Sequence, residues 1–333
     1  MSVPDPMDAG ASDAAANLAR DERDRRVYLG LLAGGSILLA AYFAAVPALG
    51  FSLSFHFYLM LWIVMASGFN VAAGFMGYMP FGYVAFFGVG AFTTAILYKV
   101  VGVGAWLAIP AAGVAGLVLA LLFAPTLRLS GIYFAIVSLA LAGILRLVIS
   151  NLPEEITGGS FGLNLGSRGE PVTSFYLMLG LLIFTLAVVS GLSRSRLGTA
   201  LRAVRDDADA AAAMGVDVTR TRLKGWLIAA LLPALCGGIE AWYTNVVDTE
   251  TAFNTLTTAK TIIYAVAGGL GTITGPVVGA LVMVFVDDVF WRQFPVANLL
   301  LLGLATILLV LFLPRGIVGT LLRARPRWRR FVP

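Results

Sequence analysis

The sequence predicts an all-α polytopic membrane protein with about eight transmembrane helices, one glycine-rich re-entrant hairpin and cytoplasmic N and C termini. Hydrophobic residues make up 59% of the 333 residues and charged residues only 12%, whereas soluble domains carry about 25% charged residues. The apolar residues gather in ten segments, counting both limbs of the hairpin, and most of the basic residues fall between them in short stretches. This composition excludes an ordinary soluble enzyme.

The transmembrane segments follow from run length, because a spanning helix needs about 20 mainly apolar residues. The runs predicted to cross once each are 27–50, 53–73, 78–98, 103–124, 130–150, 172–192, 225–246 and 297–313. Residues 1–26 lack the cationic start, apolar core and cleavage site of a secretory signal, so they are expected to form a polar cytoplasmic leader. The transmembrane domain is then predicted over 27–314, followed by a basic cytoplasmic tail over 315–333.

The basic residues set the predicted orientation. Most of the 23 lysines and arginines lie in the stretches 20–26, 194–224 and 315–330. Lys and Arg next to membrane segments are retained on the cytoplasmic side, so all three stretches are expected there. This rule also explains the basic tail, and no nucleic-acid partner is predicted.

A glycine-rich segment lies between the last two predicted spans. Residues 259–286 are long enough to cross once, but the run is interrupted at Gly268, Gly269, Gly271, Gly275 and Pro276. A single crossing would place the basic tail opposite the 194–224 loop, so two half-helices that dip in and return are favoured. Irregular backbone at membrane depth must be buried or line a cavity, so the hairpin is expected at the centre of the bundle. A kinked spanning helix with an extra crossing elsewhere is the alternative.

The sequence carries no visible catalytic machinery. It lacks the GxxxxGK[ST] phosphate loop and the HExxH and GxSxG motifs. Its single cysteine, Cys236, and single histidine, His56, cannot form a disulfide scaffold or a His/Cys metal cluster. No catalytic, cofactor-binding or metal-binding residue is predicted.

The most informative polar segment is the predicted cytoplasmic loop 193–224. Thr199 can cap a helix and Gly215 can end it. An apolar face at helical spacing is formed by Leu201, Val204, Ala208 and Ala211. Pairs at i,i+4 are expected on the other face, namely Arg202 with Asp206 and Arg205 with Asp209. The segment is either an apolar knob for a groove on a partner or a solvated connecting helix.

Two charged residues fall within predicted spans. Arg146 and Glu240 each lie about sixteen residues from the cytoplasmic end of their helix, so they are expected at similar depth. Ionisable residues at membrane depth usually pair or face a water-filled cavity, which predicts an intramembrane ion pair. The alternative is that Arg146 snorkels to the outer interface.

The loop sequence GTALRAVRDDADAAAAMGVDVTRTRLK at 198–224 resembles that of branched-chain amino acid ABC transporter permeases of the LivM type. Further matches follow in the same order along the chain: GYMPFGYVAFFGVGAFT at 77–93, LSGIYFAIVSLA at 129–140, TGGSFGL at 157–163, GGLGTITGPVVGA at 268–280 and LPRG at 313–316. Together they cover nearly everything after the leader.

The resemblance implies a transport subunit of an ATP-driven importer in the bacterial cytoplasmic (inner) membrane, with branched-chain or related amino acids as substrate. It implies a second related permease, two cytoplasmic ATP-binding subunits and a periplasmic substrate-binding protein as partners, within membrane lipid. The chain itself would then be no enzyme and would need no cofactor.

The resemblance also assigns candidate site residues. An ATPase-coupling helix is expected at Gly198, Leu201, Arg202, Val204, Arg205, Asp206, Asp207, Ala208, Met214 and Gly215. In it, the apolar positions up to Ala208 would dock into the ATPase and both arginines would face its acidic rim. The outer loop at Thr157, Gly158 and Gly159 is where the binding protein would dock. The hairpin residues Gly268, Gly269, Gly271, Gly275 and Pro276 either expose backbone groups to the substrate or allow close helix packing.

Other functions remain open at this stage. Urea and amide importers have closely similar permeases. An ion-coupled carrier or channel should show carboxylates inside the bundle, where only Glu240 qualifies. A membrane enzyme should gather several ionisable groups near one interface, and the sequence shows no such cluster.

Overall fold

The computed structural model describes residues 38–159, 162–166, 171–294 and 316–324, with isolated residues at 30, 34–35 and between 297 and 311. Within this part of the chain, six helices are long and apolar enough to cross a membrane, and α3 is a shorter apolar helix. The expected all-α polytopic class is confirmed. The predicted leader lies outside the described residues, as do parts of the tail and of the spans 27–50 and 297–313.

The helices and strands follow one another with short connections. In chain order they are α2 (Leu53–Asn70), the π-helical turn η1 (Val71–Phe75), α3 (Val84–Lys99), α4 (Ala105–Phe123), the 3-10 turn η2 (Ala124–Arg128), α5 (Gly131–Ser150), α6 (Glu154–Thr157), β1 (Leu163–Asn164), α7 (Pro171–Arg194), α8 (Arg196–Asp206), α9 (Ala208–Ala213), α10 (Val218–Thr244), β2 (Val246–Val247), α11 (Thr249–Ala252), α12 (Thr255–Gly268), α13 (Thr274–Gln293) and α15 (Gly316–Ala324).

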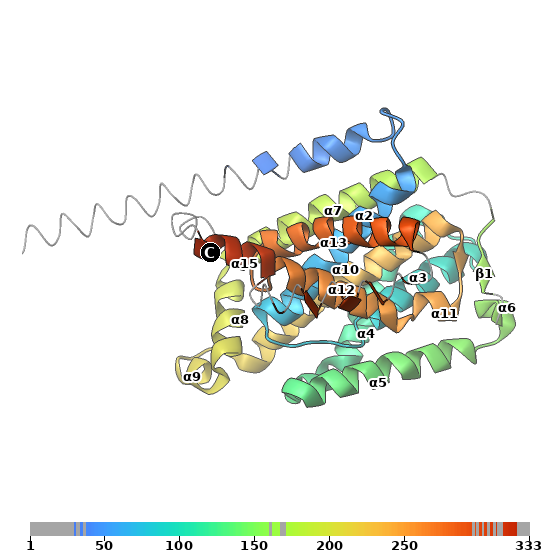
Figure 1. The fold of residues 1–333 in the computed structure, drawn as a ribbon. Helices are drawn as coiled ribbons and strands as arrows, with labels where there is room; N and C mark the ends of the chain where they lie inside the picture. Colours follow the sequence, from blue (N-terminus) through green and yellow to red (C-terminus); the bar gives the residue numbers. More distant parts are fainter. Residues whose placement is uncertain are drawn as a thin grey trace, which may run out of the picture.

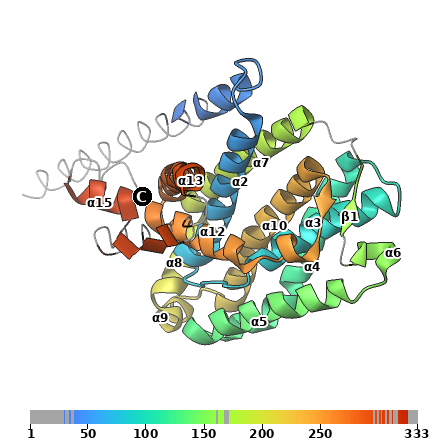
Figure 2. The ribbon, with the colours of Figure 1, turned by 45° about the vertical axis from the view of Figure 1, so that its right-hand side comes forward.

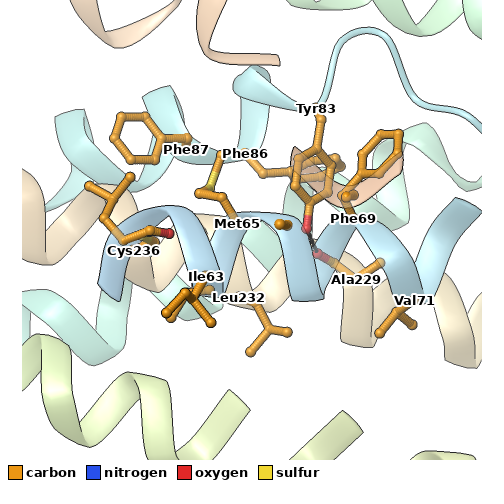
Figure 3. Close-up of a cluster of buried hydrophobic side chains, with 14 of the residues drawn as sticks. Ile63, Met65, Phe69, Val71, Tyr83, Phe86, Phe87, Ala229, Leu232 and Cys236 are labelled. Carbon is orange, nitrogen blue, oxygen red and sulfur yellow. Dashed lines mark hydrogen bonds between the residues drawn. The ribbon is translucent and has the colours of Figure 1, made fainter. Parts of the chain in front are cut away.

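The central helix of the bundle is α2. It packs against α7, α10, α12 and α13, and its side chains are buried from Leu59 to the end of η1 except for Trp62. A helix that is apolar all round is expected in the interior of a bundle, because no face of it gains from exposure. Figure 3 shows part of this core, where Met65 and Phe69 of α2 meet Phe86 of α3 and Leu232 of α10.

The two ends of the bundle are built differently. The helices α8 and α9 lie at one end, and α6, α11 and the two short strands lie at the other (Figures 1 and 2). The strands are antiparallel, with Leu163 opposite Val247. The helix α5 runs along one edge of the bundle and exposes most of its apolar residues. That exposure suits a helix whose outer face meets lipid.

The predicted span 78–98 is wrong at its beginning. Residues 76–83 are not an α-helix, and α3 begins only at Val84. Pro80 lacks a backbone N–H and disfavours helical geometry in the residue before it, which explains the interruption. The segment is nevertheless largely buried, and its polar groups find partners: the Tyr83 hydroxyl donates to the Ala229 carbonyl at 2.8 Å, and the Thr258 hydroxyl accepts from the Val84 N–H at 3.0 Å. The helix α3 therefore starts inside the bundle.

Glycines bring α3 and α10 close together. A side chain at Gly90 would collide with the carbonyl oxygen of Ala234, and one at Gly237 would collide with the backbone of Phe87. Small residues allow such close approach of helix backbones in membranes, where packing is the main source of helix association. The contact fixes α3 against α10, the longest helix of the described residues.

The glycine-rich segment forms the turn between α12 and α13. The backbone of Gly268 packs against Gly275 and Gly279, so the two helices run antiparallel at close range. Gly269 and Gly271 have φ of 115° and 82°, a region that side chains disfavour. However, α13 has 20 residues, so the second limb has the length of a full crossing rather than of the predicted half-helix. Pro276 lies in its first turn, where proline does not break a helix.

The buried side chain of Asn70 holds this turn. Its Oδ1 accepts from the Gly271 N–H at 2.7 Å, and its Nδ2 donates to the Thr272 carbonyl at 2.9 Å. The turn is thereby fixed at the end of α2 that leads into η1. It lies at the end of the bundle that also carries α8, not at mid-depth.

We expect Gly90→Ala to destabilise the protein by about 1–3 kcal/mol, because the added methyl group forces α3 away from α10. The matched control is Gly143→Ala on the exposed face of α5, where nothing lies within 4 Å of the added group. That control should be neutral or stabilise by up to about 1 kcal/mol, since alanine favours helix. Thermal unfolding of the two purified variants in detergent compares them, and equal midpoints would contradict the close contact.

We expect Asn70→Ala to cost about 1–3 kcal/mol, because it leaves two half-buried backbone groups unpaired. The control is Asn151→Ala at the exposed end of α5, which should change stability by about 0.5 kcal/mol or less. Hydrogen exchange followed by mass spectrometry adds a local test. Peptides covering 269–273 should exchange faster in Asn70→Ala, and unchanged protection there would show that Asn70 does not hold the turn.

Candidate functional site

The predicted coupling segment consists of two helices rather than one. The Ser195 hydroxyl accepts from the Gly198 N–H at 3.1 Å, so α8 begins one turn before Thr199, and the predicted cap at Thr199 is wrong. Asp207 then caps α9, because its carboxylate accepts from the N–H groups of Asp209 and Ala210 at 3.0 and 2.9 Å. The two helices form an elbow, residues 196–215, at one end of the bundle (Figure 1).

The apolar face of α8 packs on the protein's own bundle. Leu201 is 1% exposed and Val204 is 4% exposed. Leu201 lies against Gly225 of α10, and Gly198 packs closely on the end of α7. Ala208 is half-buried. Leu201 and Val204 are therefore covered by the protein's own bundle, and their docking into an ATPase stays a prediction.

Both arginines of α8 also turn towards the bundle. The Arg202 guanidinium donates to the Ser193 carbonyl at 3.0 Å and lies 5.9 Å from the centre of the Phe75 ring. The Arg205 guanidinium donates to the Gly74 carbonyl at 2.5 Å. Carbonyl groups at a helix C-terminus attract cations, which explains why both side chains reach back to helix ends.

The predicted i,i+4 pairs are accordingly not formed. Arg205 pairs instead with its neighbour Asp206, at 2.8 Å, and Arg202 has no carboxylate partner among the described residues. The two arginines anchor the elbow, and the Arg205 side chain remains 33% exposed while it does so.

The exposed surface of the elbow combines charged and small residues. Those exposed along it are Arg196, Thr199, Ala203, Arg205, Asp206, Asp207, Asp209, Ala210, Ala212, Ala213, Met214 and Gly215. Met214 is 86% exposed at the tip, just before Gly215 ends α9 with a φ of 86°. From the predicted set, this surface retains Arg205, Asp206, Asp207, Met214 and Gly215.

The glycines of the hairpin lie in close contact with neighbouring backbone groups. Gly275 packs on the carbonyl of Gly269, Gly268 packs on α13, and Pro276 is buried. Gly316, at the start of α15, also packs on Gly268 and Gly269. This geometry favours the packing alternative over exposed backbone groups.

The predicted outer loop is a compact turn at the opposite end of the bundle. Thr157 is buried, and its hydroxyl donates to the Pro153 carbonyl at 3.4 Å. Gly158 and Gly159 have φ of 74° and 57°, and a side chain at Gly158 would collide with the carbonyl of Gly162. These residues shape the loop that leads to β1. A docking role for them stays a prediction.

Arg146 and Glu240 are not brought together. Arg146 is exposed on α5 and Glu240 is half-buried on α10. Each ion pair found within the described part of the chain joins other residues: Arg205–Asp206, Arg220–Asp217, Lys260–Asp287 and Arg292–Asp288. Counting along the two helices could not show that Arg146 is exposed while Glu240 is half-buried. The exposure of Arg146 fits the snorkelling alternative.

A cavity of about 740 Å³ lies between α2, α12 and α13, at the end of the bundle opposite the elbow. Its lining residues are Ser52, Ser54, Phe55, Tyr58, Trp62, Asn254, Leu256, Thr257, Lys260, Val284, Asp287, Asp288, Trp291 and Arg292. The Lys260 ammonium and the Asp287 carboxylate form an ion pair of 2.7 Å on its wall. Lys260 falls inside the apolar run 259–286 and Asp287 follows it directly, so their position beside this run was the available signal in the sequence.

The comparisons with known proteins agree with this architecture. Residues 51–313 match the family described as branched-chain amino acid transport system / permease component. The chain is 30% identical over 291 residues to the high-affinity branched-chain amino acid transport system permease protein LivM of Salmonella typhimurium, which covers 78% of this chain and 68% of that protein. LivM of Escherichia coli is 28% identical over the same shares.

A more distant relative carries a different name. The autoinducer 2 import system permease protein LsrC of Klebsiella pneumoniae is 32% identical over 167 residues, which cover 44% of this chain and 48% of that protein. No solved structure matches. The family match covers most of the chain, from α2 to the last predicted span. The chain belongs to the permease component family of branched-chain amino acid transport systems.

Proposed function

We propose that this protein is a transmembrane permease subunit of an ATP-driven importer that moves branched-chain or related amino acids across the bacterial cytoplasmic membrane. The observation that carries the proposal is the elbow 196–215, which is anchored to the bundle on one side and presents an exposed tip on the other. A connecting loop needs no such anchoring. The names of the LivM relatives support the substrate class.

The proposed orientation follows the basic residues. With 194–224 in the cytoplasm, the elbow faces two ATP-binding subunits, while the cavity and the 157–159 turn face the periplasm and its substrate-binding protein. The leader 1–26 and the tail 315–333 lie in the cytoplasm in this arrangement, and 27–314 form the permease domain beside a second related permease. The hairpin then enters from the periplasmic side, reaches the cytoplasmic end at 269–273 and returns.

The contacts define a route by which the elbow can act on the bundle. Arg205 of the elbow binds the carbonyl of Gly74 in η1, and Asn70, one turn earlier, binds the hairpin turn at Gly271. The limbs of that hairpin carry Lys260 and Asp287 to the cavity at the other end. A displacement of the elbow by ATP-driven closure of its partners would thus reach the cavity through a short chain of bonded groups.

The proposal is tested by isolating the tagged chain from its native membrane and measuring ATPase activity with the co-purified binding protein. Recovery of ATP-binding subunits and a sister permease, with stimulation by leucine, isoleucine or valine, is the expected result. A panel containing urea and amides tests the closest alternative. A chain that purifies alone and still moves solute would contradict the proposal and indicate a carrier or channel.

We expect Met214→Asp to lower ATP-driven uptake about tenfold or more, because a carboxylate at the elbow tip would be buried unpaired against the ATP-binding subunit. The chain should remain folded, since Met214 touches little of its own bundle. The matched control is Asn164→Asp, which places a carboxylate on an exposed residue at the opposite end. Uptake and copurification of the ATPase are measured for both variants. Normal uptake in Met214→Asp would remove the tip from the docking surface.

We expect Arg205→Met to uncouple ATP hydrolysis from uptake. The variant loses a charged hydrogen bond to Gly74, which is worth about 1.5–3 kcal/mol, so uptake per ATP should fall about tenfold. Arg220→Met is the control, because it removes an exposed pair with Asp217 that contributes about 1 kcal/mol or less. The ratio of transported solute to hydrolysed ATP in proteoliposomes is the measurement. An unchanged ratio in Arg205→Met would show that the route does not pass through this side chain.

A further inference from the structure

The cavity between α2, α12 and α13 carries a mostly buried ion pair on its wall. We propose that this cavity binds a zwitterionic α-amino acid, with the ammonium group on Asp287 and the carboxylate on Lys260. The inference rests on the proposed function and deepens it, because it names the chemical group of the substrate that the permease itself would recognise.

The first argument is the placement of the ion pair. The side chains of Lys260 and Asp287 are only 22% and 17% exposed, and they project from two helices that run through the bundle. The free energy needed to remove two charges from water offsets much of their mutual attraction, so such a pair adds little to the stability of the fold. Ionisable residues within membrane helices mark substrate and ion pathways more often than structural contacts.

The second argument is that the two oxygens of the Asp287 carboxylate differ in their hydrogen bonds. Its Oδ2 accepts both from the Lys260 ammonium, at 2.7 Å, and from the Tyr264 hydroxyl, at 3.3 Å. Its Oδ1 is buried and has no hydrogen-bond partner within the described part of the chain. A buried acceptor without a donor is costly. An ammonium group, with three N–H donors, would satisfy this oxygen.

The third argument is the arrangement of charge around the cavity. Its walls carry Lys260 and Arg292 against Asp287 and Asp288, so the lining has no net charge but separate positive and negative points. Lys260 lies in the second turn of α12, whose N-terminus adds a favourable potential for a carboxylate. The two charged groups of a zwitterion can each bind a residue of opposite charge. A simple cation or anion would be attracted to one pair of residues and repelled by the other.

The apolar wall of the cavity completes the site. Phe55, Tyr58, Trp62 and Trp291 line it together with Val284. The Lys260 ammonium lies 6.0 Å from the centre of the Trp62 ring, so the charged and aromatic parts adjoin. A hydrocarbon side chain can therefore bury itself beside the pair that holds its amino and carboxyl groups. Urea and simple amides present neither charge, and the site would discriminate against them.

The test uses a cysteine reporter in the cavity of the assembled transporter. The sequence contains one cysteine, Cys236, which is fully buried, so Thr257→Cys introduces a reachable thiol one turn from Lys260. We expect millimolar L-leucine to slow the modification of this thiol by a charged methanethiosulfonate reagent. Isopentylamine and 4-methylpentanoate, which each lack one of the two charges, should not slow it. Leu256→Cys, also in the lining, is the second reporter if the first variant fails to assemble.

The variants Asp287→Asn and Lys260→Gln, made in the reporter background, should each raise the half-protecting leucine concentration about tenfold or more. The matched controls are Glu250→Gln and Lys99→Gln, which remove exposed charges at the same end of the bundle and should leave protection unchanged. Protection that survives in Asp287→Asn and Lys260→Gln, or equal protection by urea, would overturn the site.

Leucine uptake by the same reporter complex distinguishes a failure of the zwitterion site from a failure of the proposed importer function. Uptake without any protection overturns the zwitterion site and leaves the importer intact. Loss of ATP-dependent uptake in the unmodified complex, by contrast, overturns the proposed function itself. Protection by L-leucine alone, lost in both charge variants, supports both.

Discussion

The two hydrogen bonds between Asn70 and the turn at 269–273 are the interaction on which the arrangement of the bundle depends. Backbone groups inside a membrane protein need partners within the protein, and a turn without helical bonds leaves several of them free. Asn70 supplies a donor and an acceptor from the most buried helix. The bonds thereby tie α12 and α13 to α2, and they do so next to Gly74, where Arg205 attaches the elbow.

Small residues solve the complementary problem of bringing helices close enough for such bonds. Gly90 and Gly237 let α3 and α10 touch along their backbones, and Gly268 does the same for α12 against α13. Because α3 begins only at Val84, inside the bundle, its first N–H group meets Thr258 of α12. The start of α3 and the short α12 thus meet in the interior, where Thr258 provides the acceptor for the first N–H group of α3.

The sequence predicted the positions of most helices well, because the length of an apolar run decides them. It predicted poorly which way individual side chains face. Run length located α4, α5, α7 and α10 within a few residues at most ends, although α10 begins seven residues before its predicted start. The apolar composition continues through 76–83, so it could not show that Pro80 interrupts the helix there. The spacing of Leu201 and Val204 revealed an apolar face but not what covers it. Counting along the helices likewise could not show that Arg146 is exposed and Glu240 half-buried.

The hairpin connects the elbow end of the bundle with the cavity at the other end. Its dimensions favour the transmission of a displacement from one end to the other over independent motion of the two ends. The 14 residues of α12 span about 21 Å at 1.5 Å per residue, which is the separation between the turn and the first residues of the cavity wall. A helix of this length moves as a rigid rod, and close packing of Gly268 on α13 prevents the limbs from sliding apart. Any displacement of the turn must therefore shift Lys260 and Asp287 relative to α2, which changes the shape of the cavity that they share with Trp62.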